Sequence, residues 1–455
     1  MEHAPREDAR RAGLREVLTM SWPIILGSFS YTIMQFVDMI MVSRLGTDAL
    51  AAGGSAGVWS YTMGCLIFGT VGCVSTFVAQ SLGRGELHNC ARYAWQGVYL
   101  SFSAAALTLL LWPVSEVLFR SMGHSPEVTR LELIYFRIRL IGYVPMAWNT
   151  ALASFFQAVN RPKIPMYAAI VANIANIVLN YLLIFGHFGF PKWGIGGAAV
   201  ATVISQGLQV VLIQGIFLGK EMHALYASRT SYAFDPARLR ELIRIGFPSG
   251  ITVFMDVANW GIFTSFVVGH FGATQLAAHN AAVNFMHVAF MPALGLNQGI
   301  AAIVGQYVGR GDIPRAKART YTAMKIASAY MCFVGLSFAV FGRVLMRAFT
   351  AEPDVISLGH ILLILAAIFQ GFDAINIVTS GALRGAGDTR WMAWLMFVGA
   401  YFVFLPLAML LAWPMRLGAV GAWIGATVYI VGLSGFFFRR FRSERWRNIR
   451  IFSAD

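Results

Sequence analysis

Long apolar stretches, separated by short polar segments, follow one another along most of this chain. The sequence predicts twelve of them as membrane-spanning helices, at residues 18–42, 54–79, 93–115, 131–157, 164–186, 195–218, 243–268, 278–304, 321–345, 357–382, 391–413 and 417–438. Each has about the 20 residues that a helix needs to cross the hydrocarbon core of a bilayer. None shows the alternation of apolar and polar positions that a barrel strand requires. We therefore expect an all-α polytopic membrane protein.

The two halves of the chain resemble each other. Residues 46–53, "GTDALAAG", align with residues 272–279, "GATQLAAH", and residues 78–86, "VAQSLGRGE", align with residues 304–312, "VGQYVGRGD". Six spans lie in each half, so both halves start from the same side of the membrane. Parallel six-helix repeats with a site between them are a transporter architecture. This pattern predicts two pseudo-symmetric six-helix bundles around a central cleft.

The repeat also predicts the domain organisation. We expect a cytoplasmic N-terminal segment at 1–17, an N-lobe with the first six spans at 18–218, a cytoplasmic inter-lobe linker at 219–242, a C-lobe with the last six spans at 243–438, and a basic cytoplasmic tail at 439–455.

The charge balance bears on orientation more than on partners. The chain is 57% hydrophobic and 12% charged, yet its formal net charge is +14. Most of its 35 Lys and Arg residues fall on one side of the predicted membrane topology. Such an excess marks the cytoplasmic side, so we expect a multi-pass protein of the plasma (inner) membrane with both termini cytoplasmic. No basic face is interleaved with exposed aromatic residues as single-stranded nucleic acid would require. The expected partner is the lipid bilayer, not nucleic acid.

Motifs for catalysis and cofactors are missing from the sequence. The four cysteines have no metal-ligand spacing, and the histidines at 270, 279 and 287 are too scattered to indicate a metal site. HExxH does not occur, and there is no ATP-binding loop of the form GxxxxGK[ST]. We expect no enzyme activity and no cofactor. Any energy for transport would then come from an ion gradient.

Three acidic residues lie near the centres of predicted spans: Asp38, Asp256 and Asp373. A charged side chain at bilayer depth costs about 3 kcal/mol or more, so such residues usually face the interior of a bundle and mark ion or proton paths. We therefore interpret these carboxylates as cation-exchange or substrate sites.

Each acid has polar or aromatic neighbours at helical spacing. The stripe in the seventh span combines Asp256 with Asn259 and Trp260, and the tenth span has the series Phe369, Gln370 and Asp373. Buried asparagines in membrane bundles often only join helices. A purely structural role therefore remains an alternative for the amide side chains.

The chain resembles the multidrug and toxic compound extrusion (MATE) family, in its NorM-like branch, over about residues 15 to 440. The motifs that carry the resemblance are "FVDMIMVSRLG" in the first span, "AQSLGRGE" with its second-half copy, "NIANIVLNYLLIFG", and "FDAINIVTSGALRGAGDT" in the tenth span.

This resemblance implies two cation sites. An N-lobe coupling site would comprise Asp38, Asn176, Asn180 and Thr202. A C-lobe site for cation or substrate would centre on Asp256 and Asp373, and we add its helical neighbours Asn259, Gln370, Trp260 and Phe369.

Two residues depart from the family pattern. The family often has Glu at the position of Asp256 and Tyr at the position of Phe369. The missing phenol removes a possible sodium ligand, which favours protons as the coupling ion. Sodium stays open, and Na⁺ at these sites would be the one metal ion that we expect.

The function that the resemblance implies is a cation-coupled (H⁺ or Na⁺) multidrug efflux antiporter. It would export lipophilic organic cations by alternating access and would act as a monomer. The alternative is a lipid-linked saccharide flippase of the same superfamily, which would need a cationic cleft. Arg137 and Arg139 in the fourth span suit that alternative, but three central acids oppose it.

Overall fold

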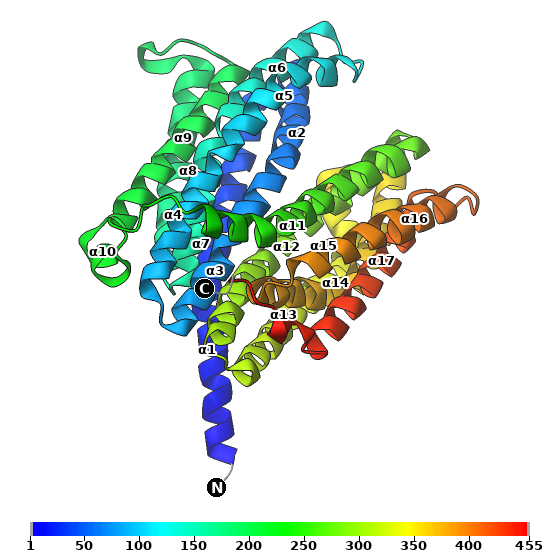
Figure 1. The fold of residues 1–455 in the computed structure, drawn as a ribbon. Coiled ribbons are helices and arrows are strands. Elements are labelled where there is room, and N and C mark those ends of the chain that lie inside the picture. Colours follow the sequence, from blue (N-terminus) through cyan, green and yellow to red (C-terminus); the bar gives the residue numbers. More distant parts are fainter. Residues whose placement is uncertain (1–2, 453–455) are drawn as a thin grey trace. The chain divides into compact units, whose positions relative to one another are not determined.

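The computed structural model describes the backbone of residues 3–452 and the side chains of residues 11–452. Within this part of the chain, all regular secondary structure is helical (Figure 1). The ends of the predicted N-terminal segment and basic tail, residues 1–2 and 453–455, lie outside the described residues. The expected all-α class is confirmed. Helices satisfy their own backbone hydrogen bonds, which a bilayer core demands of any spanning segment.

Eleven segments of the described chain are long and apolar enough to cross a membrane. They are α1 (His3–Ser43), α2 (Thr47–Gly72) with α3 (Val74–Arg84), α4 (Leu87–Ser101) with α5 (Ser103–Arg120), α8 (Lys163–Phe185), α9 (Ile195–Phe217), α11 (Pro236–Ile262) with η2 (Phe263–Val267) and η3 (Val268–Phe271), α12 (Ala273–Gly309), α13 (Ile313–Phe349), α14 (Pro353–Ala386), α15 (Thr389–Val398) with η4 (Gly399–Phe404) and α16 (Leu405–Ala412), and α17 (Gly418–Arg442).

The remaining predicted span, the fourth along the chain, is divided into two helices. α6 (Pro126–Ile141) and α7 (Tyr143–Ala158) have 16 residues each and follow one another with only Gly142 between them. Together they cover the predicted span at 131–157, so the prediction of twelve spans is confirmed. The remaining short helices are η1 (His187–Gly189), α10 (Lys220–Tyr226) and η5 (Arg445–Asn448).

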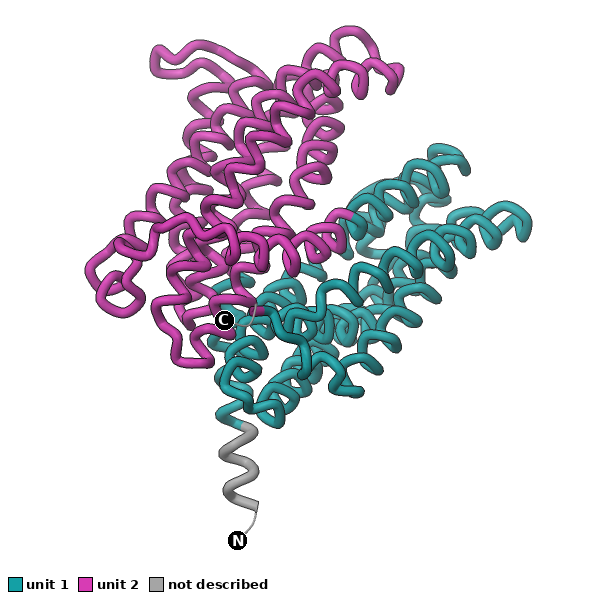
Figure 2. Tube along the Cα trace, viewed as in Figure 1, with its two compact units in different colours: residues 1–25, 255–451 teal, residues 26–254, 452–455 magenta. Residues whose placement is uncertain are grey.

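The chain forms two compact units (Figure 2). Unit 1 contains the chain up to Ile25 and from Met255 to Ile451, and unit 2 contains Leu26 to Phe254 with Phe452. The long helices α1 and α11 therefore contribute to both units. Each has an internal proline, Pro23 or Pro248, within two turns before the point of division. A proline inside a helix removes a backbone hydrogen bond and kinks it, which fits a change of packing partner there.

Polar contacts hold the first parts of α1 and α11 in their units. In unit 1, Glu16 of α1 accepts hydrogen bonds from Arg319 Nε at 2.6 Å and from the Tyr307 hydroxyl at 2.9 Å. In unit 2, the Tyr93 hydroxyl donates to the buried Glu241 of α11 at 2.5 Å. Charge-assisted bonds of this kind are stronger than neutral ones. The first parts of α1 and α11 are thus each held by a tyrosine hydroxyl that donates to a glutamate.

Glycine allows a very close approach of α8 and α9 in unit 2. A Cβ atom on Gly197 of α9 would lie 2.5 Å from the carbonyl oxygen of Leu183 on α8. Small residues at such crossings let backbones meet and gain dispersion energy, which drives helix association in lipid. This crossing matters for function because α8 and α9 carry three of the predicted N-lobe residues.

We expect Gly197→Val to lower the stability of the protein by about 2 kcal/mol, because overpacking a tight contact costs about 1–3 kcal/mol. Thermal unfolding in detergent measures the effect. The matched control is Gly207→Val on the same helix, where an added Cβ meets no atom within 4 Å. An unfolding temperature for Gly197→Val at or above that of the control would contradict the close packing of α8 on α9.

Unit 1 contains two π-helical turns. η2 follows α11, and η4 lies between α15 and α16. Their rings meet, because the centroids of Phe263 in η2 and Phe404 in η4 are 5.2 Å apart. π-turns are rare and occur often at functional sites. The part of unit 1 that follows Asp256 on α11 is therefore a candidate functional region.

Candidate functional sites

The four predicted N-lobe residues form one hydrogen-bonded chain in unit 2. Asn180 on α8 donates its Nδ2 to the Asp38 carboxylate on α1 and also to Asn176 Oδ1 at 3.0 Å. Asn176 Nδ2 in turn donates to Thr202 Oγ1 on α9 at 3.4 Å. Asn176 and Asn180 are fully buried, whereas Asp38 is half-buried. The structure therefore brings Asp38, Asn176, Asn180 and Thr202 together, and we call them the N-lobe site.

A cation of α6 accompanies the N-lobe site. The Arg139 guanidinium lies close enough to Asp38, Tyr31 and Tyr135 to interact with them electrostatically. Its Nε atom is buried and has no hydrogen-bond partner in the structure. The sequence predicts Arg139 in the fourth span and gives it no partner there. No spacing within that helix indicates the pairing with Asp38, because the two residues lie on different helices.

Hydrogen-bond donors approach the Asp38 carboxylate. Asn180 turns its amino group towards it, and the Arg139 guanidinium carries donors only. Asn180 Oδ1 is buried without a hydrogen-bond partner. An amide of this kind can donate to an ionised carboxylate and, after rotation, accept from a protonated one. The arrangement therefore suits an exchangeable proton.

The two predicted acids of the second half both lie in unit 1. Asp256 on α11 and Asp373 on α14 are close enough for electrostatic interaction. Asp373 accepts a hydrogen bond from Asn376 Nδ2 at 3.2 Å. Two neighbouring carboxylates at bilayer depth favour a shared cation or proton, because like charges at short range destabilise each other. We call the predicted residues of this half the C-lobe site.

The two amide residues of the C-lobe site each lie three positions from one of its acids in the sequence, and their side chains are buried. Asn259 and Gln370 are 4% and 2% exposed, and the side-chain oxygens of both, like Oδ1 of Asn376, have no hydrogen-bond partner in the structure. Buried polar atoms without partners are costly. These oxygens are available to a protonated group or a cation.

The aromatic residues of the C-lobe site differ in environment. Trp260 is half-buried and packs edge-on against Phe263 with ring centroids 5.7 Å apart. Phe369 is fully buried in the hydrophobic core of unit 1, where its ring lies 6.4 Å from that of Trp423. The structure therefore places Phe369 among packing residues, one turn before Asp373.

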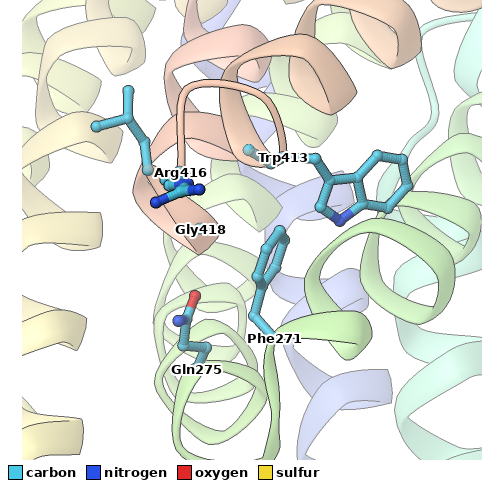
Figure 3. Close-up of a pocket in the computed structure, with 7 residues that line it drawn as sticks. Phe271, Gln275, Trp413, Arg416 and Gly418 are labelled. Carbon is cyan, nitrogen blue, oxygen red and sulfur yellow. The ribbon is translucent and has the colours of Figure 1, made fainter.

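A surface cavity of unit 1 is lined by residues of η3, the start of α12 and the segment that joins α16 to α17. It has a volume of about 360 Å³, and its lining includes Phe271, Gln275, Trp413 and Arg416 (Figure 3). None of the predicted C-lobe residues lines it. The sites above are thus defined by their hydrogen bonds and charges, not by this cavity. Among the side chains of residues 11–452, no group of three or more His, Cys, Asp or Glu could hold a metal ion.

Comparison with known proteins covers nearly the whole chain. The family model described as MatE matches residues 23–182 and 248–410. A protein of Mesorhizobium japonicum named "Probable multidrug resistance protein NorM" is 32% identical over 431 residues, which cover 92% of this chain and 91% of the relative. A protein of the same name from Thermotoga maritima is 27% identical over 391 residues, covering 86% of this chain and 83% of the relative.

Solved structures share the fold at lower identity. An outward-facing multidrug resistance MATE family transporter of the MOP superfamily superposes with a TM-score of 0.87 at 21% identity, covering 95% of this chain and 96% of its own. The eukaryotic MATE transporter AtDTX14 gives a TM-score of 0.84 at 20% identity, covering 96% of this chain and 97% of its own. At these identities the likeness establishes the arrangement of helices.

Proposed function

Because the chain belongs to the MatE family of membrane transporters, we propose that it is a multidrug efflux antiporter that exports lipophilic organic cations in exchange for protons. The observation that carries this proposal is the hydrogen-bonded chain from Asp38 through Asn180 and Asn176 to Thr202. It surrounds a half-buried carboxylate with groups that can serve both its ionised and its protonated form.

The proposed coupling step is the binding and release of one proton at Asp38. In the ionised state, Asn180 donates to the carboxylate and Arg139 supplies a countercharge. When Asp38 takes up a proton from outside, its hydroxyl donates to Asn180 Oδ1, which is free to accept. Arg139 then loses its countercharge. The two states place different forces on α1, α6 and α8, which is the differential interaction that alternating access needs.

Protons are favoured over sodium for two reasons. A sodium ion at Asp38 would need oxygen ligands where Asn180 presents an amino group and Arg139 a guanidinium. A proton needs one acceptor only, and Asn180 Oδ1 provides it.

We place substrate recognition at the C-lobe site. Asp256 and Asp373 can attract an organic cation, and Trp260 can contact its flat apolar part, since ring faces attract cations by roughly 1 kcal/mol. The relatives from Mesorhizobium japonicum and Thermotoga maritima carry the words multidrug resistance in their names. Competition between the cation and protons for the same carboxylates would connect binding to release.

The remaining parts of the proposal concern location and assembly. The chain is a polytopic membrane protein, and we place it in the plasma (inner) membrane with both termini cytoplasmic, acting as a monomer without a cofactor. The lobes at 18–218 and 243–438 are proposed as the moving bodies, with 219–242 as their linker. The flippase alternative loses support from Arg139, because that cation is matched by Asp38.

Uptake by proteoliposomes tests the function. A fluorescent organic cation is offered while a proton gradient or a sodium gradient is imposed in separate runs. We expect the proton gradient alone to drive uptake. Uptake driven only by sodium would overturn the proton assignment, and no uptake under either gradient, in folded protein, would overturn the substrate class.

The charge of Arg139 gives a second test. We expect Arg139→Gln to change the pH dependence of uptake, because the Arg139 guanidinium interacts with the Asp38 carboxylate that takes up the proton. The control is Arg137→Gln on the same helix, where the guanidinium bonds Ser115 and Glu116 instead. Equal pH profiles for the two variants would show that Arg139 does not act on Asp38.

A further inference from the structure

A fully buried histidine of unit 1 has both ring nitrogens engaged. His279 on α12 accepts a hydrogen bond at Nδ1 from the Trp423 indole Nε1 on α17, at 3.0 Å. Its Nε2 lies 2.8 Å from the Thr264 hydroxyl in η2. An indole nitrogen can only donate. Nδ1 is therefore the acceptor, and the ring proton of the neutral imidazole sits on Nε2.

The threonine side of the histidine requires the same tautomer. The Thr264 hydroxyl uses its own proton to bond the carbonyl oxygen of Trp260 at 2.8 Å. Its oxygen is then left to accept from His279 Nε2. Two independent partners thus fix one arrangement: Trp423 donates to His279, His279 donates to Thr264, and Thr264 donates to the backbone of Trp260.

This relay joins the elements that carry the two acids of the C-lobe site. Thr264 belongs to the π-turn two helical turns after Asp256, and Trp260 is itself a predicted member of the site. At the other end, the ring of Trp423 lies 6.4 Å from that of Phe369, one turn before Asp373. Threonine side chains can satisfy backbone groups where a membrane helix departs from regular geometry. The relay therefore supports the irregular turn and ties it to α12 and α17.

We propose that His279 is a positioning residue for the C-lobe site, held as a neutral imidazole by Trp423 and Thr264, and that it sets the spacing of α11 and α14. Its transport readout rests on the function proposed above. A proton added at Nδ1 would point at the indole N–H, so the Trp423 bond and a charged His279 exclude each other. Because a His279 held neutral in the fold must gain a proton on unfolding in acid, this bond makes wild-type stability fall below pH about 6.5, and loss of the bond should make that fall smaller.

Other titratable groups near this region act as background to the test. The elements that form the relay or pack against it carry titratable groups that include Asp256 on α11, His270 on η3, His287 on α12, Tyr330 on α13, His360 and Asp373 on α14, and Tyr429 on α17. All of them remain in every variant below. An acid sensitivity that is present in wild type, smaller on loss of the indole donor and smallest on loss of the imidazole therefore belongs to His279.

The test compares His279→Gln, His279→Ala, Trp423→Phe and the double variant Trp423→Phe/His279→Gln with wild type. Glutamine can accept from Trp423 and donate to Thr264, whereas alanine can do neither. We expect His279→Ala to raise KM for the organic cation about tenfold, the size of one lost buried hydrogen bond, and His279→Gln to restore most of it. Thermal unfolding of each purified variant is recorded at pH about 5.5 and about 7.5, on either side of the ordinary histidine pKa of about 6.5.

The expected result is that lowering the pH destabilises wild type most, Trp423→Phe less, and the double variant least, because the gain of a proton on unfolding is largest where the folded imidazole is held neutral and absent where there is no imidazole. Unfolding needs no substrate, so it reports on the relay even if the transport function is wrong. The proposal is overturned if acid destabilises Trp423→Phe as much as wild type, or if His279→Gln is as impaired in KM as His279→Ala.

Discussion

Asp38→Asn is expected to abolish proton-driven uptake of organic cations, by about 100-fold or more, while the protein still folds and reaches the membrane. The reason is that asparagine cannot take up or release a proton, and group-specific proton transfer commonly contributes at least that factor. The amide can still bond Asn180, so the packing of α1 on α8 is retained. Uptake in proteoliposomes under an imposed proton gradient measures the loss.

The control for this result is a carboxylate away from both sites. Asp354 lies exposed in the first turn of α14, and Asp354→Asn removes the same charge there. We expect it to transport like wild type. Undiminished uptake by Asp38→Asn at equal expression would remove Asp38 from the coupling step.

The second large effect concerns substrate binding. We expect the double variant Asp256→Asn/Asp373→Asn to weaken binding of an organic cation by about 100-fold, and each single variant by less than about tenfold, since each unit of 1.4 kcal/mol is a factor of ten in affinity. The two carboxylates interact, so removing one relieves repulsion on the other and limits the single effects. Fluorescence polarisation with a fluorescent organic cation measures the binding to purified protein.

Asp38→Asn is the matched control for binding. Its carboxylate lies in unit 2, whereas both C-lobe acids lie in unit 1, so we expect it to bind the cation like wild type although it fails to transport. If the double variant keeps wild-type affinity and turnover, the substrate is bound elsewhere. If Asp38→Asn loses binding as well, coupling and recognition share one site.

The spans themselves could be predicted because one physical demand dominates them. A segment in lipid must be apolar and must satisfy its backbone, and both demands are visible in sequence. Finer features do not carry such a signal. The interruption at Gly142 and the π-turns at 263–267 and 399–404 depend on tertiary contacts, and a local change of helical period is too short to appear in the apolar pattern.

The functional sites also divide into features that the sequence predicts and features that depend on tertiary packing. Asp38, Asn176, Asn180 and Thr202 could be proposed together because a family resemblance supplied the grouping, and the structure brings them into one hydrogen-bonded chain. The approach of Arg139 to Asp38 depends on how α6 packs beside α1, which spacing within one helix cannot give. The sequence likewise gave no reason to connect His279 with Trp423, since 144 positions separate them.

The central claim is that organic cations leave in exchange for protons through Asp38, and substrate-driven proton movement tests it most directly. Proteoliposomes that contain a pH-sensitive dye and hold a proton gradient receive the organic cation without any other driving ion. The account predicts that the cation dissipates the gradient with wild-type protein and leaves it intact with Asp38→Asn. Accumulation of the cation by wild-type protein with no movement of protons, or equal proton movement in Asp38→Asn, would contradict it.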